Sequence, residues 1–499
     1  TGLAGEGNLE QIDELVHRFT VAQRLLQSLE PVGVGARDLA ECLTLQLKAM
    51  AADEGSAIDP DTVQTALRVC QQPLEMLARR DIRRLTQLCG DGEERTRAAG
   101  LHRWYVVEFD AAADLDKAAL DMARIAEVSK VEFNQQLMHV HEGRVIPLAE
   151  TGAAPQTRAA VGFNDPHLGK QWHYINTGDK SIYSKIKAGA DVNCDEAWQL
   201  CTGDPRVIVA VVDNCVQWDH PDLAANMWVN EAELNGTPGV DDDGNGYVDD
   251  IYGYNFTKET GELDFSAELM HGTHVAGTIA AVNNNGVGVC GIAGGSGRGD
   301  GVKIMTCQIF HPTDGRYDAS SNATADAIKY AADNGAVICQ NSWGYAAGSM
   351  SLDQWINQDR AVKEAIDYFI QYAGMSPDGQ TQTGPMAGGV VIFAAGNENS
   401  GQPGYPAAYE PCISVAAVSC TYEAAWYTNY GPTVDICAPG GGDAADFSRP
   451  IHYNEGYNLS TLPTDLQNGM TFVYTNFRGE VETHTIDYVS ETLGYGYMQ

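Results

Sequence analysis

Three polar residues stand where a parallel α/β sheet usually carries its functional groups. Asp213 ends a β-branched apolar run, His271 opens a run of small and apolar residues, and Asn397 ends a second apolar run. Open α/β sheets place functional side chains at the carboxyl ends of their strands. A carboxylate, an imidazole and an amide can there accept, hold and donate protons. Taken singly, each also fits a structural role, as a helix cap or a turn residue.

The surrounding runs predict the elements that hold these side chains. The apolar segments 206–213 and 389–397 are typical of buried parallel strands. Segment 271–281 has its apolar residues at helical spacing, so we expect a helix that begins at His271. Small residues such as Gly272 would let this helix approach the sheet closely. The sequence therefore predicts an α/β domain with a doubly wound parallel sheet.

Five motifs, in a fixed order, resemble those of subtilisin-like serine peptidases. They are "VVDNCVQWDHPDL" (211–223), "HGTHVAGTIAA" (271–281), "NSWG" (341–344), "VIFAAGNENS" (391–400) and "VDICAPGG" (434–441). The resemblance covers roughly residues 160–499. It implies that Asp213 orients His271, and that His271 takes a proton from a nucleophilic serine. It also implies that Asn397 donates its amide hydrogen bond to the oxyanion.

The same resemblance implies where a substrate would bind. Asn341, Ser342, Trp343 and Gly344 would line the cleft and pair with an extended peptide by strand addition. Polypeptides are therefore the expected substrates. His274, which also lies in the histidine motif, is assigned to packing.

Two features depart from the family pattern. Cys215 stands two residues after Asp213, where the family has glycine. The Gly-Thr-Ser motif of the nucleophile is absent from the 499 residues, and Ser448, Ser460 and Ser490 lack its setting. The final residues, "ETLGYGYMQ", resemble the lead-in to that motif. We therefore expect a fragment that stops just short of its catalytic serine and is inactive.

The segment "GVDDDGNGYVDDIYGYNF" resembles the first half of a calcium loop, in which oxygens at alternate positions converge on one hard cation. The candidate ligands are Asp241, Asp243, Asn245, Asp249 and Asp250. Tyr252 stands where such a loop has its twelfth-position glutamate, so Asp250 or another part of the chain would have to complete the shell. We expect a calcium site here; an acidic turn without an ion is the alternative.

Residues 1–99 show helical periodicity and predict an all-α segment. The phrases "LLQSLEPVGVGARDLAECLTLQLKAM" (25–50) and "PLEMLARRDIRRLTQLCG" (73–90) closely resemble the core-binding region of sigma-N-type RNA polymerase sigma factors. This resemblance implies core RNA polymerase as a partner and the cytoplasm as the location of this segment. The promoter-reading parts of that family are missing.

A small α+β unit is expected next, over residues 101–140, with a strand at 102–110, a helix at 114–127 and a second strand at 129–137. Such a unit, placed before a protease, resembles a subtilisin-type propeptide, which is a folding aid and inhibitor. The expected division of the chain is a sigma-like segment 1–99, a propeptide-like unit 101–140, a linker and entry segment 141–204, and a C-terminally incomplete catalytic domain 205–499.

Composition narrows the classes of function. The chain carries 67 acidic and 31 basic side chains, a net charge of −36, and this argues against direct nucleic-acid binding because phosphates would be repelled. The sequence contains no run of 18 apolar residues of the kind that forms a membrane-spanning helix. The protease part is expected to be secreted or periplasmic; the chain shows no signal peptide, and its start is interpreted as trimmed.

Three functions stay open at this point. The first is a subtilisin-like serine endopeptidase, present without its nucleophile. The second is a transcription component that binds core RNA polymerase through residues 1–99. The third is a pseudo-protease that binds peptides without cutting them. Residues 1–100 contain ten Arg and one Lys, whereas the remainder contains ten of each, and this change predicts a recombined gene.

Overall fold

The computed structural model describes residues 39–52, 94–109, 114–139, 146–147, 162–265, 269–313, 316–442, 457–465, 471–475, 481–485 and 495–498. The chain divides into two compact units, residues 1–93 with Gly244–Gly246, and the remainder. In the first unit, α2 (Leu39–Ala52) is a helix in the expected place. The other helices expected before residue 90 lie outside the described residues.

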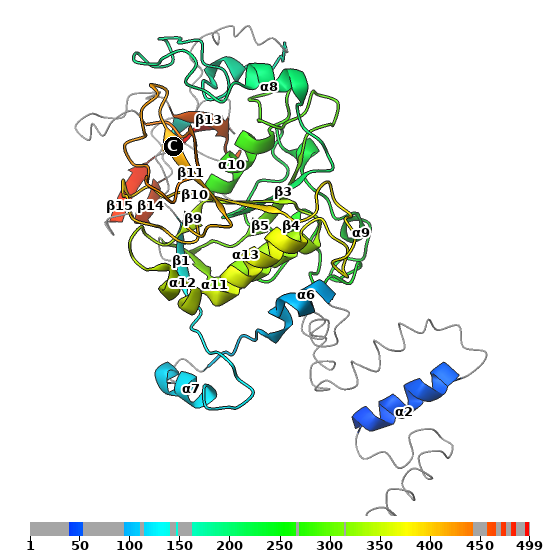
Figure 1. The fold of residues 1–499 in the computed structure, drawn as a ribbon. Coiled ribbons are helices and arrows are strands. Elements are labelled where there is room, and N and C mark those ends of the chain that lie inside the picture. Colours follow the sequence, from blue (N-terminus) through cyan, green and yellow to red (C-terminus); the bar gives the residue numbers. More distant parts are fainter. Residues whose placement is uncertain are drawn as a thin grey trace, which may run out of the picture. The chain divides into compact units, whose positions relative to one another are not determined.

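A seven-stranded parallel sheet forms the centre of the larger unit, with strand order β12-β11-β10-β8-β3-β5-β4 (Figure 1). Its strands are β3 (Ile208–Asp213), β4 (Gly253–Asn255), β5 (Lys303–Gln308), β8 (Ile338–Asn341), β10 (Val390–Ala394), β11 (Ile413–Val418) and β12 (Ile436–Pro439). Every neighbouring pair runs parallel. The predicted parallel α/β sheet is therefore confirmed.

Helices cover both faces of this sheet. They are α10 (His271–Ala280) on one face and α11 (Ser321–Asp333), α12 (Leu352–Gln358) and α13 (Arg360–Tyr372) on the other (Figure 1). Successive side chains of a strand point to opposite faces, and β3 uses this alternation. Val209 and Val211 lie in one buried cluster with Ala276 of α10, whereas Ala210 and Val212 lie in the cluster formed with α11 and α13.

Smaller elements surround this core. The short helices are η3 (Leu168–Lys170), α8 (Cys194–Leu200), η4 (Ala224–Asn226) and α9 (Glu231–Leu234). One antiparallel sheet consists, in spatial order, of β6 (His311–Thr313), β7 (Arg316–Ser320), β1 (Gln136–His139) and β9 (Trp343–Gly344). A second consists of β13 (Asn458–Thr461), β16 (Tyr495–Met498) and β2 (Ile146–Pro147), and β14 (Thr471–Thr475) pairs with β15 (Val481–Thr485). Within the described part of the chain, no helix combines the length and apolarity needed to cross a bilayer.

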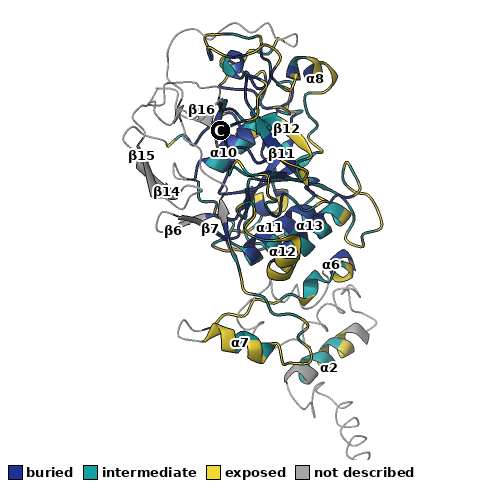
Figure 2. Cartoon of the chain, turned by 60° about the vertical axis from the view of Figure 1, so that its left-hand side comes forward, coloured by how far each residue is buried: buried dark blue, intermediate teal, exposed yellow. Residues whose placement is uncertain are grey.

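The segment after residue 100 differs from its predicted secondary structure. Over residues 102–109 the expected strand does not form: η2 (Leu101–Arg103) is followed by irregular chain in which Tyr105 is 60% exposed. The expected helix is present but shorter, as α7 (Leu115–Met122), which has no buried residue (Figure 2). Only β1 remains of the second strand, at its C-terminal end. A lone apolar alternation therefore predicted a strand that finds no neighbouring strand here.

Residues of this segment cap the first turns of the two helices α11 and α13. Glu132 accepts hydrogen bonds from the backbone N–H groups of Arg360 and Ala361, both at 3.3 Å, and the side-chain oxygen of Asn134 accepts from Asn322 N–H at 3.2 Å. The first N–H groups of a helix have no partner within the helix, and its N-terminus favours negative charge. The upstream segment thus stabilises the start of both helices.

The opposite end of α13 is capped from further upstream, by α6 (Glu94–Ala99). Arg95 is 2% exposed and donates to the carbonyl oxygens of Tyr372 (3.2 Å) and Met375 (2.8 Å). Its guanidinium also pairs with Asp333, at the end of α11, at 2.9 Å. A cation at a helix C-terminus interacts favourably with the helix dipole.

A buried histidine in the larger unit makes the stability of the fold depend on pH. His173 is 3% exposed, and neither ring nitrogen has a hydrogen-bond partner among the described residues. Burial, and to a lesser extent the neighbouring His274, lowers the pKa of His173 to about 3. Between pH 6.5 and 3 the His173 side chain is protonated in the unfolded chain but neutral in the folded chain. The free energy of unfolding therefore decreases as the pH falls.

We therefore expect the free energy of unfolding to decrease by about 3–5 kcal/mol between pH 7 and pH 3 through this residue alone. His173→Leu should flatten that dependence, because it removes the titrating group and keeps an apolar side chain. Urea unfolding at several pH values measures both slopes. Equal slopes for the variant and the parent chain would contradict the assignment.

Candidate active site

Asp213 and His271 meet at the carboxyl edge of the parallel sheet. Asp213 is the last residue of β3 and is fully buried, and His271 is the first residue of α10. The Nδ1 atom of His271 lies 2.9 Å from both carboxylate oxygens of Asp213. The His271 side chain is 11% exposed. A histidine held at Nδ1 by a carboxylate is oriented to accept a proton at Nε2.

Close packing of the α10 start depends on Gly272. A Cβ atom at this position would stand 2.3 Å from the carbonyl oxygen of Cys215, a distance that real Cβ atoms do not reach. Cys215, which stands where the sequence comparison expected glycine, is itself accommodated in the interior and is 1% exposed. Burial raises the pKa of the Cys215 thiol far above its usual range, so this group stays protonated and is no nucleophile.

Asn397 lies three residues after β10, in a loop on the same edge of the sheet. Asn429, which is buried, holds this loop: its side-chain oxygen accepts from the backbone N–H groups of Glu398 (3.1 Å) and Ser400 (3.0 Å). Its amide also donates to the carbonyl oxygen of Ala395 at 2.8 Å. Asn429 is a supporting residue that the sequence analysis did not find, since no local pattern links it to a loop some thirty residues earlier.

The "NSWG" motif leaves β8 and becomes β9. Asn341 is fully buried and donates to the carbonyl oxygen of Ile392 at 3.1 Å, so its side chain is committed to the sheet. Ser342 accepts a hydrogen bond from Gln340 at 2.8 Å. The Trp343 indole is buried and donates to the Val212 carbonyl oxygen at 3.1 Å. Of the motif, Trp343 and Gly344 supply the strand that pairs with an extended segment.

That segment is part of the same chain. β1 lies between β7 and β9, antiparallel to both. Met138 pairs with Gly344 of β9 and with Asp318 of β7, and Leu137 is fully buried in the cluster that also contains Trp343. The position expected for an extended peptide is thus filled by residues of the propeptide-like segment.

Of the three serines singled out from the sequence, only Ser460 lies among the described residues. It is fully buried in β13 and donates to the His274 carbonyl oxygen at 2.8 Å. The neighbouring Thr461 donates to the Thr273 carbonyl oxygen at 2.7 Å. Ser460 therefore packs against the helix that carries His271 and has a structural partner of its own.

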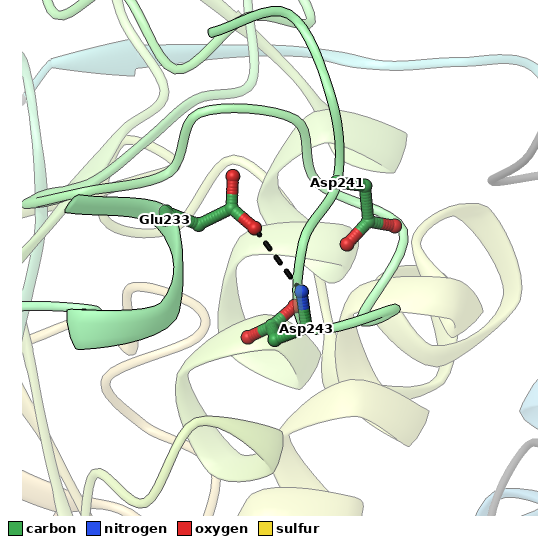
Figure 3. A group of neighbouring side chains, drawn as sticks. All are labelled: Glu233, Asp241 and Asp243. Carbon is green, nitrogen blue, oxygen red and sulfur yellow. Dashed lines mark hydrogen bonds between the residues drawn. The ribbon is translucent and has the colours of Figure 1, made fainter. Parts of the chain in front are cut away.

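The acidic loop brings together only some of its predicted ligands. Asp241 and Asp243 lie with Glu233, and one oxygen of each lies within 4.8 Å of the others (Figure 3). Asp249 accepts from Gly239 N–H at 2.8 Å, and Asp250 is fully buried, where it accepts from Asn230 (2.8 Å) and Tyr330 (2.7 Å). The role of Asn245, in the turn Gly244–Gly246, stays a prediction.

Glu233 was not predicted, because it precedes the loop on a short helix, α9. Its carboxylate accepts hydrogen bonds from the backbone N–H groups of Asp242 (2.6 Å) and Asp249 (2.8 Å). The residue therefore also shapes the loop. Three carboxylates that converge in this way offer the oxygen ligands that calcium prefers.

Known proteins match both parts of the chain. Residues 204–479 match the subtilase family, and residues 6–101 match the core binding domain of sigma-54 factors. Halolysin of Haloferax mediterranei is 30% identical over 289 residues, which are 58% of this chain and 45% of halolysin. Thermitase of Thermoactinomyces vulgaris is 30% identical over 249 residues, 50% of this chain and 68% of thermitase.

One further relative and one solved structure are also similar. The halolysin-like extracellular serine protease Nep of Natrialba magadii is 29% identical over 324 residues, 63% of this chain and 50% of that protein. The crystal structure of fervidolysin from Fervidobacterium pennivorans aligns with a TM-score of 0.42 and 22% sequence identity. The alignment covers 73% of this chain and 42% of the fervidolysin chain. The chain spans about half the length of the two halolysins. Because the family match covers more than half of its residues, the chain belongs to the subtilase family.

Proposed function

We propose that the catalytic unit is that of a serine-type endopeptidase. The observation that carries this proposal is the contact of His271 Nδ1 with both oxygens of Asp213 at 2.9 Å, at the carboxyl edge of the parallel sheet. In this role Asp213 orients the imidazole, His271 acts as general base, and Asn397 donates to the oxyanion. The nucleophile is not among the residues that we can assign.

The experiment that tests this proposal uses the translation product of the uninterrupted gene. It should hydrolyse casein, and a serine-reactive phosphonate should abolish the activity. The His271→Ala variant should be inactive, whereas His274→Gln, three residues further along the same helix, should retain activity. A fully active His271→Ala variant would overturn the proposal.

We further propose that the segment 101–140 acts as a propeptide, which blocks substrate binding and assists folding. Two contacts support this role. β1 fills the strand position between β7 and β9, and Glu132 with Asn134 caps the helices that pack beneath the sheet. Release of β1 would then be needed before a peptide substrate pairs with Gly344.

A calcium ion is proposed as a structural cofactor of the loop at residues 241–250. Glu233, Asp241 and Asp243 would hold it, and carboxylate oxygens are the donors that this cation prefers. Three carboxylates this close together repel one another, so a bound divalent cation would remove an unfavourable interaction. Binding would stabilise the loop and take no part in the chemical step.

Millimolar calcium should therefore raise the midpoint of thermal unfolding, since a ligand at 100 times its Kd adds about 2.7 kcal/mol. Asp243→Asn should lose most of this increase, because it removes one charged ligand. Glu410→Gln, which neutralises an exposed acid elsewhere, is the matched control and should keep it. Differential scanning calorimetry with calcium and with chelator measures the effect; identical midpoints would contradict a site.

A second candidate function concerns residues 6–101, whose match to the sigma-54 core binding domain supports binding of core RNA polymerase. The full chain, immobilised at one end, should capture purified bacterial core polymerase at micromolar concentration and should not capture free DNA. Absence of capture would leave the protease as the only proposed activity. The protease part itself is proposed to act outside the cytoplasm, as the name of the Natrialba relative states for that protein.

A further inference from the structure

We propose that Asn214 is a positioning residue that holds the start of the His271 helix on the strand that carries Asp213. The inference rests on the proposed function, because it assigns a role in presenting the general base. Asn214 is fully buried and follows Asp213 directly. It is not one of the residues that the family motifs assigned to catalysis.

The first observation is the position of its side-chain oxygen. Oδ1 of Asn214 accepts a hydrogen bond from the backbone N–H of Gly272 at 2.8 Å. Gly272 is the second residue of α10, where backbone N–H groups have no partner within the helix. The residue at the N-cap position, Met270, provides no side-chain hydrogen bond. Asn214 therefore caps this helix from a distant part of the chain.

The second observation is that the same residue also fixes the carboxylate. The backbone N–H of Asn214 donates to Oδ1 of Asp213 at 2.7 Å. One end of Asn214 thus orients the acid, and the other end holds the backbone on which His271 is mounted. Asp213 and the backbone that carries His271, the two sides of the 2.9 Å contact, are therefore both hydrogen-bonded to one residue.

The neighbouring residues continue this attachment in register. The carbonyl oxygen of Cys215 lies against Gly272, where an added Cβ would stand 2.3 Å away. Thr273 Oγ1 accepts from Gln217 N–H at 3.0 Å. Residues 213–217 and 271–273 therefore meet pairwise, and Asn214 supplies the link closest to the imidazole. A displacement of about 1 Å at a reacting group can cost roughly 10² in rate.

The two polar atoms of the Asn214 side chain differ in their contacts, and only the oxygen, Oδ1, takes part in holding the helix. Nδ2 is buried and has no hydrogen-bond partner among the described residues. A buried donor without a partner is unfavourable, so an asparagine here is not the side chain that packing alone would favour. A smaller residue that still presents an acceptor oxygen, such as serine, should replace it in part.

The test measures the ring of His271 in the 499-residue chain, so no nucleophile is needed. The protein is labelled with ¹³C and ¹⁵N at histidine, and His271→Gln assigns its resonances. In the parent chain the two ring nitrogens of His271 should differ strongly in ¹⁵N shift, as expected for a single tautomer with the proton on Nδ1. In Asn214→Ala that difference should fall by at least half, because the ring samples more than one position.

Two further variants make the result specific. Asn214→Ser keeps an acceptor and should restore most of the shift difference. Thr273→Val removes the adjacent hydrogen bond of the same attachment and should leave the His271 shifts unchanged, even where it lowers stability. The proposal is overturned if Asn214→Ala keeps the parent pattern, or if Thr273→Val disturbs it equally. Hydrolysis by the full gene product tests the proposed function separately, so the two failures are distinguishable.

Discussion

The 499-residue chain should form no covalent adduct with a fluorophosphonate probe and should not hydrolyse casein above the rate of its His271→Ala variant. His271 and Asp213 can hold and accept a proton, but no assigned residue supplies the attacking oxygen. Ser460 is engaged with the His274 carbonyl oxygen, and the Cys215 thiol is kept protonated by burial. In subtilisin, loss of the serine alone lowers kcat by about 2 × 10⁶, a value known for that enzyme rather than derived from this chain.

Intact-mass spectrometry after incubation with the probe, with the product of the uninterrupted gene as positive control, decides this prediction. A stoichiometric adduct on the 499-residue chain that disappears in its His271→Ala variant would show that one of its own serines is the nucleophile. Ser448→Ala and Ser490→Ala, which alter the two serines singled out from the sequence that lie outside the described residues, would then be tested first.

Expulsion of β1 should open the cleft. In Leu137→Asp a carboxylate would enter a cluster in which Leu137 is fully buried, at a cost of about 3–5 kcal/mol. We therefore expect the ratio of released to bound β1 to rise by roughly 10²–10⁴. Hydrogen exchange at the β7 and β9 amides should accelerate accordingly, because these strands lose their shared partner.

A labelled peptide with the sequence of residues 132–141 provides the second readout. It should bind Leu137→Asp and not the parent chain, whose own β1 occupies the site. Leu120→Asp is the matched control, since Leu120 lies in the same segment but is 61% exposed. Equal peptide binding by parent and variant would contradict the proposed inhibition. Binding without cleavage, also in the full gene product, would favour the pseudo-protease.

The central sheet and the histidine helix were predictable because their signals are local. The run that ends at Asp213 is buried on both sides, so it is apolar throughout, and the helix at His271 shows its period within eleven residues. Asn214 and Asn429 were not predictable in this way. Their partners, Gly272 and the loop after β10, come from distant parts of the sequence and leave no pattern around the residue itself.

In the propeptide-like segment, the sequence pattern predicted an element that the structure does not contain. The alternation around Tyr105 is that of a strand, but a strand needs a neighbour to bond with, and the alternation does not say whether one is present. β1 does find neighbours, and these are residues 319 and 344, far along the chain. Glu233 was missed for a related reason, since calcium-loop spacing describes ligands within the loop and not those on a preceding helix.

Around Arg95, the boundary between the two sequence matches differs from the boundary between the two compact units. Arg95 lies inside the match to the sigma-54 core binding domain, which ends at residue 101, yet its guanidinium is buried against the ends of α11 and α13. A polypeptide that began at Leu101 would lose the hydrogen bonds from Arg95 to the Tyr372 and Met375 carbonyl oxygens. It would also lose the ion pair of Arg95 with Asp333, which would keep its contact with Lys329. Residues 94–99 therefore belong to the sigma-54 match by sequence and to the larger unit by their contacts, so a cut that preserves these contacts has to fall before Glu94.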